Sequence, residues 1–211
     1  MDKNQIAVSV FDRRAVDYQE KFMDVSRYHA SLDLFCERVS PSGAEVLELA
    51  CGPGNNTRYL LQKRPDFRIL GTDLAPRMVE LAQANNPDAS FQVMDCRAVS
   101  QLNRTFDAIM CGFGLPYLTR EEAAQLIADA AGVLRPGGIL YLSTMEDDYA
   151  KSGIHQSSAG DQLYLYYHQA DYLSEALLVH GFSLLHLERM TDERRPELPF
   201  NDLILIAQKQ G

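Results

Sequence analysis

The fold of this chain is decided by the segment Val46-Leu47-Glu48-Leu49-Ala50-Cys51-Gly52-Pro53-Gly54-Asn55-Asn56-Thr57. An apolar, strand-like run enters a turn of small residues, and helical sequence follows. Ala50, Gly52 and Gly54 carry little or no side chain, so a ligand can lie against bare backbone there. The helix that follows offers free N–H groups and the positive end of its dipole. The segment therefore predicts a ligand loop that suits an anionic group such as a carboxylate.

Two other interpretations of this loop are open. A pair of glycines is also typical of a tight strand-to-helix turn that binds no ligand. A dinucleotide fingerprint needs the pattern G-x-G-x-x-G, but Thr57 stands where the third glycine would be. The missing glycine disfavours a pyrophosphate clamp and hence a NAD-type oxidoreductase.

Two aspartates follow the loop at the ends of later strand-like runs. Asp73 closes the second run, about twenty residues beyond the glycines, where it can accept both ribose hydroxyl hydrogens. Asp95 closes the third run, where it can accept from an adenine amino group while the backbone N–H of Cys96 donates to the ring. Each aspartate can instead be a helix N-cap. Suitable groups at three successive strand ends favour a nucleoside site.

Short apolar runs alternate with helical stretches around this site, which predicts an α/β fold with a parallel sheet covered on both faces. The expected strands are residues 45–49, 67–72, 90–94, 106–111, 139–143, 182–188 and 203–208. The expected helices run from the glycine turn to residue 62 and over residues 76–84, 120–134 and 171–179. Thr119 and Glu122 form a capping box before the third helix. A turn at residues 135–138 separates that helix from the fifth strand. The last two strands lack a helix between them, which favours an antiparallel pair at one edge.

The first forty residues are predicted to be helical. One apolar stripe connects Phe11, Ala15, Tyr18, Phe22, Val25, Leu32 and Phe35. Residues 40–43 then break the pattern. We therefore expect a helical cap at residues 1–40 and a main domain at residues 41–211, with a lid insertion at about residues 146–168.

Composition limits the function classes. The 211 residues carry a net charge of −9, which disfavours nucleic acid as a partner. No apolar run is long enough to span a membrane, and the N-terminus has no secretory signal pattern, so we expect a cytoplasmic protein. The four cysteines include no C-x-x-C pair, so we expect neither a metal site nor a disulfide framework.

Together these motifs resemble class I methyltransferases that depend on S-adenosylmethionine (SAM), in particular the small-molecule branch of the type 11/25 or UbiE-like sort. Residues 46–57 are similar to the glycine motif of that family, with Ala50 in place of the usual first glycine. The resemblance extends over nearly the whole chain and includes residues 106–111, the Leu134-Arg135-Pro136-Gly137-Gly138 turn and the N-terminal segment Phe11-Asp12-x-x-Ala15-x-x-Tyr18.

The resemblance implies a doubly wound, Rossmann-like sheet of seven mostly parallel strands in the order 3-2-1-4-5-7-6, with the last strand antiparallel. It implies that SAM lies across the carboxyl ends of strands one to four and donates its methyl group to a small molecule. The cofactor residues implied are Tyr18, Glu48, Ala50, Cys51, Gly52, Gly54, Asn56, Thr57, Asp73, Leu74, Met78, Asp95, Cys96, Cys111 and Phe113. We expect a monomer or homodimer.

Methyl transfer from a sulfonium is an in-line displacement that mainly needs alignment and exclusion of water. A base is needed only if the acceptor must lose a proton. Many relatives carry a histidine after strand four, where this chain has Tyr117 and its neighbours. The candidate catalytic residues are therefore Tyr117, His155 and His168, and a structural or surface role is the alternative for each histidine. Tyr164, Tyr166 and Tyr167 either wall the pocket or form the core of the lid.

Three rival functions remain. The first is the NAD-type oxidoreductase, which shares the glycine turn and the ribose acid. The second is a SAM-binding module without catalysis. The third is other SAM chemistry on the same fold, such as decarboxylation or carboxymethyl transfer.

Overall fold

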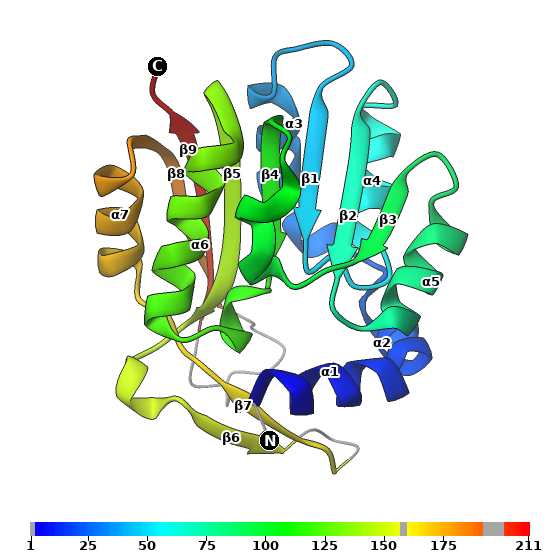
Figure 1. Ribbon diagram of the computed structural model, residues 1–211. Helices are drawn as coiled ribbons and strands as arrows, with labels where there is room; N and C mark the ends of the chain where they lie inside the picture. Colours follow the sequence, from blue (N-terminus) through cyan, green and yellow to red (C-terminus); the bar gives the residue numbers. More distant parts are fainter. Residues whose placement is uncertain (1–2, 157–159, 192–200) are drawn as a thin grey trace.

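The apolar runs expected as strands pair into one seven-stranded sheet in the computed structural model, which describes residues 3–156, 160–191 and 201–211. The strand order is β3-β2-β1-β4-β5-β9-β8 (Figure 1). The strands are β1 (Glu45–Leu49), β2 (Arg68–Asp73), β3 (Ser90–Val93), β4 (Phe106–Gly112), β5 (Leu134–Glu146), β8 (Phe182–Met190) and β9 (Asn201–Lys209). β1 to β5 pair in parallel, and β9 is antiparallel to both of its neighbours. The expected order is confirmed, because β8 and β9 are the sixth and seventh strands of this sheet.

Helices cover both faces of the sheet, as a doubly wound fold requires. Alternate strand residues point to opposite faces, so Leu47 joins the core beneath α6 (Arg120–Val133) and α7 (Ala170–Val179). Its neighbour Val46 joins the core beneath α3 (His29–Arg38) and α4 (Asn55–Lys63). α5 (Pro76–Asn85) packs beside β2 and β3.

The start of α6 is as expected, but the start of β5 differs from the prediction. The capping box of Thr119 and Glu122 is complete in both directions. α6 ends at Val133, and Leu134 already pairs with Phe106 of β4. The register then shifts before Ala108 pairs with Ile139. The glycine-rich residues 135–138 therefore stand opposite the single residue Asp107 of β4 and form an irregularity within β5.

The N-terminal region is helical, but the prediction of one apolar stripe along it is wrong, because the region is divided into several helices. It consists of α1 (Lys3–Arg13), α2 (Ala15–Phe22), the short η1 (Ser26–Tyr28) and α3. Leu32 and Phe35 are buried beneath the sheet, whereas Ala15 belongs to a separate cluster around α5. Asp24 accepts a hydrogen bond from the backbone N–H of Ser26, a local turn that competes with helix continuation.

Residues between β5 and α7 form an extra hairpin that the sequence patterns did not indicate. β6 (Gly153–Gln156) and β7 (Gln162–Leu165) pair antiparallel as a second small sheet after the short η4 (Tyr149–Lys151). β7 packs beside α1 across the carboxyl edge of the main sheet (Figure 1). The division into a cap at residues 1–40, a main domain and a lid at about residues 146–168 stays a prediction. Within the described part of the chain, no helix has the length and apolar character of a membrane span.

Candidate functional site

The loop after β1 holds a ligand-ready shape through its own backbone. Ala50, Gly52 and Gly54 all have left-handed φ angles, of 51°, 53° and 76°. This conformation is easy for glycine and strained for alanine, and such strain is typical of functional sites. Cys51 N donates to Thr72 O at 2.9 Å, and Asn86 Nδ2 donates to Gly54 O at 3.0 Å. The loop is therefore fixed to β2 and α5 while its backbone faces outward.

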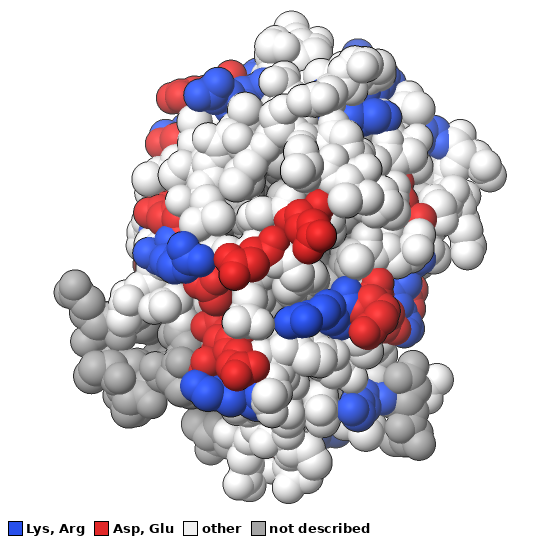
Figure 2. Space-filling view, turned by 90° about the vertical axis from the view of Figure 1, so that its left-hand side faces the viewer, with Lys and Arg blue, Asp and Glu red and all other residues white. Residues whose placement is uncertain are grey.

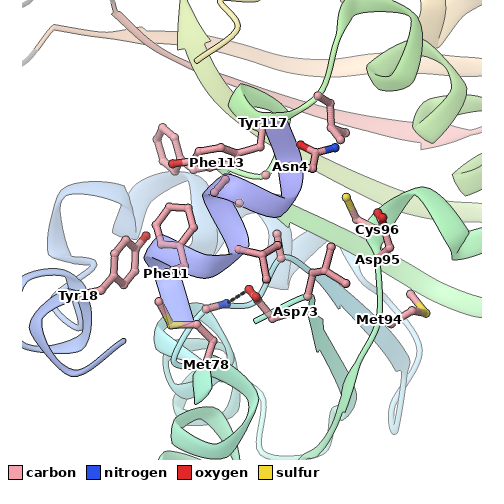
Figure 3. A pocket seen from close by; sticks show the side chains of 18 residues that line it. Asn4, Phe11, Tyr18, Asp73, Met78, Met94, Asp95, Cys96, Phe113 and Tyr117 are labelled. Atoms are coloured by element: carbon pink, nitrogen blue, oxygen red, sulfur yellow. Dashed lines mark hydrogen bonds between the residues drawn. The ribbon is translucent and has the colours of Figure 1, made fainter. Parts of the chain in front are cut away.

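A cavity opens in front of this loop (Figure 3). It lies at the carboxyl ends of β1 to β4, where ligands bind in open α/β sheets, and α1 lies over it. The structure brings ten of the predicted residues to its wall: Tyr18, Ala50, Gly52, Asp73, Leu74, Met78, Asp95, Cys96, Phe113 and Tyr117.

The other predicted cofactor residues lie behind the wall instead of on it: Glu48, Cys51, Gly54, Asn56, Thr57 and Cys111. Glu48 is fully buried and accepts a hydrogen bond from the hydroxyl of Thr57 at the start of α4. Burial raises the pKa of Glu48 to about 7. Burial also raises the pKa of the Cys111 thiol to about 12. These positions favour a role in shaping the loop.

Asp73 joins the loop to the start of α5. Its Oδ2 accepts from Gly52 N and its Oδ1 from Ala75 N, both at 2.9 Å. Burial raises the pKa of Asp73, while these backbone hydrogen bonds oppose the rise. Each carboxylate oxygen keeps a further lone pair. The side chain can therefore organise the turn and still accept hydrogen bonds from a ligand.

Asp95 is engaged by a cation that the sequence analysis missed. Arg97 donates to its carboxylate from Nε at 3.0 Å and from Nη2 at 2.6 Å. The backbone N–H of Arg97 also donates to Asp95 Oδ1 at 2.9 Å. Burial opposes ionisation of Asp95, but the hydrogen bonds and charge of Arg97 outweigh burial and lower its pKa. The same guanidinium reaches Glu122 at 2.7 Å. Asp95 is thus an ionised N-cap at the wall, and its contact with an adenine stays a prediction.

Aromatic rings close the side of the cavity toward α1 and α2. The Phe11 ring packs edge-on against Tyr18 and Tyr117, with centroids 5.6 Å and 5.1 Å apart. Burial raises the pKa of Tyr18 to about 12 and raises the pKa of Tyr117 as well. Both phenols are therefore neutral at ordinary pH. Tyr117 is the catalytic candidate that the structure places on the cavity wall.

Neither candidate histidine lines the cavity. His168 is fully buried, with Nε2 2.8 Å from Leu115 O and Nδ1 in contact with the Tyr172 hydroxyl. Burial lowers its pKa to about 4. His155 lies in β6, with Nε2 3.2 Å from the Tyr167 hydroxyl. These contacts favour the structural alternative for His168, and catalysis by His155 stays a prediction.

The sequence analysis also missed lining residues on α1. Asn4, Ala7 and Val8 line the cavity beside Phe11. Ala7 lies four residues before Phe11, which extends the helical spacing of Phe11, Ala15 and Tyr18 toward the N-terminus. The same spacing in the sequence could therefore have indicated Ala7, but the predicted apolar stripe began at Phe11.

The wall fits an adenosyl sulfonium. Gly52 presents bare backbone to the cavity, and a Cβ built there would point at the Tyr18 ring, 3.7 Å from Cε1. Among the described residues that line the cavity, the charged side chains are Asp73 and Asp95. Two carboxylates beside aromatic faces suit a cationic ligand. In the described ranges no group of three or more His, Cys, Asp or Glu side chains could hold a metal ion.

Residues 46–138 match a family model described as a methyltransferase domain. Over these residues the chain is similar to methyltransferase domains, and its fold is that of the similar solved structure described next. Among solved structures, magnesium protoporphyrin IX methyltransferase from Synechocystis with bound SAM superposes with a TM-score of 0.74 at 19% identity and covers 100% of this chain and 98% of its own.

Curated relatives match this chain over part of its length. Trans-aconitate 2-methyltransferase from Variovorax paradoxus is 33% identical over 100 residues, which are 47% of this chain and 38% of that protein. Demethylmenaquinone methyltransferase from Thermotoga maritima is 30% identical over 142 residues, which are 64% of this chain and 60% of that protein. The chain thus spans less than two thirds of the length of either relative.

Proposed function

We propose that this chain is a SAM-dependent methyltransferase that transfers a methyl group to a small-molecule acceptor by in-line displacement. One observation carries the proposal: the bare loop backbone at Gly52 and the carboxylate of Asp73 meet in a covered cavity at the carboxyl ends of parallel strands. The methyltransferase domain match at residues 46–138 supports it.

Each part of the wall has a role in this proposal. Bound SAM supplies a methyl group that is already activated by the sulfonium charge. Asp73 accepts from the ribose hydroxyls, and Asp95 from the adenine amino group. The positive end of the α4 dipole, behind the loop, favours the carboxylate of the methionine moiety beside the bare backbone at Gly52. α1 and the rings of Phe11 and Tyr117 keep water from the reacting atoms.

The proposal specifies the methyl acceptor only by class, as a small molecule. The relatives are named for trans-aconitate and demethylmenaquinone, two very different molecules. Among the described residues on the face in Figure 2, acidic side chains form a central band with basic ones beside it. That face lacks the continuous positive surface that a phosphate backbone needs. Exclusion of nucleic acid and membrane, a cytoplasmic location and a monomeric or homodimeric state stay predictions.

Isothermal titration with S-adenosylhomocysteine (SAH) and with NAD tests the cofactor. We expect SAH to bind the wild type and NAD not to bind. Asp73→Asn should weaken SAH binding at least about tenfold, since it loses charge-assisted hydrogen bonds to the ribose. Gly52→Ala should do the same, because the left-handed φ of 53° strains a residue with a Cβ and the methyl group would lie against the Tyr18 ring at the cavity wall. The exposed Asp88→Asn is the matched control and should bind like the wild type.

Circular dichroism of each variant separates lost binding from lost folding. Absence of SAH binding by the folded wild type would overturn the proposal, and binding of NAD instead would favour the oxidoreductase. Catalysis is tested by incubating the protein with SAM and a fractionated metabolite extract while SAH is measured. Binding of SAH without turnover in any fraction would favour the non-catalytic module. A product other than a methylated acceptor would favour decarboxylation or carboxymethyl transfer.

A further inference from the structure

Helix α1 is the inner cover of the cofactor cavity. Its residues Asn4, Ala7, Val8 and Phe11 line the cavity opposite the loop after β1. α1 thus forms one wall of the cavity, and the strand ends, the start of α5 and the turn that carries Tyr117 form others (Figure 3). A movement of α1 away from the loop would widen the opening through which SAM and SAH exchange.

The inner face of α1 packs on the main domain through a few side chains. Ala7 and Val10 are its buried residues, and the Phe11 ring packs against Tyr117. Asp12 accepts from the backbone N–H of Arg77 at 2.8 Å at the start of α5. An 11-residue helix is marginal in water on its own. Contacts on the outer side of α1 therefore add to the hold of these inner contacts.

Those outer contacts come from β7 and the residue before it. The two oxygens of Asp161 are divided between two arginines: Oδ1 is 2.6 Å from Arg13 Nη2, and Oδ2 is 3.0 Å from Arg14 Nε. The Asp161 side chain is only 13% exposed. Hydrogen bonds from Arg13 and Arg14 lower the pKa of Asp161, so it is ionised across the ordinary pH range.

The opposite end of α1 is held by the same strand. Lys3 Nζ lies 3.5 Å from the centre of the Tyr164 ring and 3.3 Å from the Tyr166 hydroxyl. Tyr166 N donates to Pro116 O at 2.8 Å, which connects the end of β7 to the turn that carries Tyr117. β7 therefore spans α1 from end to end and is anchored to the cavity wall (Figure 1).

We propose that Asp161 is a positioning residue that clamps α1 over the bound cofactor and thereby sets the rate of cofactor release. The inference rests on the proposed function, since it takes the cavity to hold SAM and SAH. The clamp has two ends, the Asp161 ion pairs with Arg13 and Arg14 and the Lys3 contacts with Tyr164 and Tyr166. Exposed ion pairs are screened by salt, so release depends on ionic strength.

The test measures dissociation of tritiated SAH by dilution into excess unlabelled SAH, at about 50 mM and about 0.5 M NaCl. Asp161→Asn should release SAH roughly three- to tenfold faster than the wild type at low salt, and the two rates should converge at high salt. Asp88→Asn removes the same charge from an exposed position outside the site and should match the wild type at both salt concentrations.

A charge exchange distinguishes the clamp from general loosening of the lid. Replacing both arginines by glutamate and Asp161 by arginine should recover part of the slow release that the arginine substitutions alone abolish. Failure of the wild type to bind SAH would refute the proposed function. Tight SAH binding with identical release from the wild type and Asp161→Asn at low salt would refute the clamp alone.

Discussion

Glu48 and Asp73 are two carboxylates near the loop after β1 in different situations. Asp73 is held by two backbone N–H donors and reaches the cavity. Glu48 sits beneath the loop, joined to Thr57 and without access to the cavity. A carboxylate without a cation in an apolar setting favours its protonated form. Glu48 is therefore the residue through which pH acts on this part of the molecule.

Glu48 predicts a loss of stability as the pH rises from about 4.5 to about 7. Burial raises its pKa from 4.5 to about 7 in the folded state, so between these values the folded protein binds a proton that the unfolded chain does not. The contribution of Glu48 to the free energy of unfolding is fully present below the pKa of the unfolded chain. It falls by at most about 3 kcal/mol as the pH rises through the pKa of the folded protein.

Glu48→Gln should lack this pH dependence. Between about pH 5 and about pH 8, the free energy of unfolding of the wild type should fall while that of the variant does not, so the difference between them should grow by up to about 3 kcal/mol. Urea denaturation at each pH measures this difference. The exposed Glu80→Gln is the control and should follow the wild-type curve. A Glu48→Gln curve parallel to the wild type would contradict the raised pKa.

The residues at strand ends were predictable because topology fixes where strand ends meet. Gly52, Asp73 and Asp95 follow successive parallel strands, so they had to share one edge of the sheet. The pairing of Arg97 with Asp95 was not predictable, because a cation two residues beyond a strand end can point in any direction. The burial of His168 was not predictable either, because it depends on contacts with Tyr172 in α7 and with Leu115, which is distant in the sequence.

At the scale of elements, long periodic segments were predicted well and short irregular ones were not. α6 followed from its capping box and apolar spacing, and each expected strand is present. The hairpin of β6 and β7 was missed because its four-residue strands are half-exposed and carry no clear alternation. The breaks between α1, α2 and α3 were missed because Arg14 interrupts the helix without a proline or glycine.

The capping box should contribute measurably to the stability of α6. Thr119→Ala removes the side chain that accepts from Glu122 N at 3.2 Å. The loss should lower the free energy of unfolding by about 1 kcal/mol. Urea denaturation at neutral pH measures it, with the exposed Thr105→Ala as control. Equal stability of the two variants would mean that the box adds nothing.

The whole molecule consists of a rigid sheet core and a thinner cover. The strands β1, β4 and β5 lie between two layers of buried side chains, one toward α6 and α7 and one toward α3 and α4. Among the described strands, β6 and β7 pair only with each other, and Ile154 in β6 is 68% exposed. Local opening requires least free energy where few apolar contacts are lost.

Hydrogen exchange should rank these regions. We expect the amides of β1, β4 and β5 to exchange most slowly, and those of β6 and β7 to exchange fastest among the described strands. Mass spectrometry of peptides after timed exchange measures this ranking. Addition of SAH should slow exchange in α1 without changing β4. Protection of the hairpin equal to that of β4 would show that the cover and the core open as one unit.

The position of β9 has a consequence for biosynthesis. β9 lies between β5 and β8, so β8 has no hydrogen-bonded place in the sheet until residues 201–209 are available. During translation β1 to β5 can assemble as the nascent chain emerges, but α7 and β8 must wait beside an open β5 edge. Such an edge invites pairing with foreign strands. Newly made chains are therefore most prone to aggregate in the interval before the final strand leaves the ribosome.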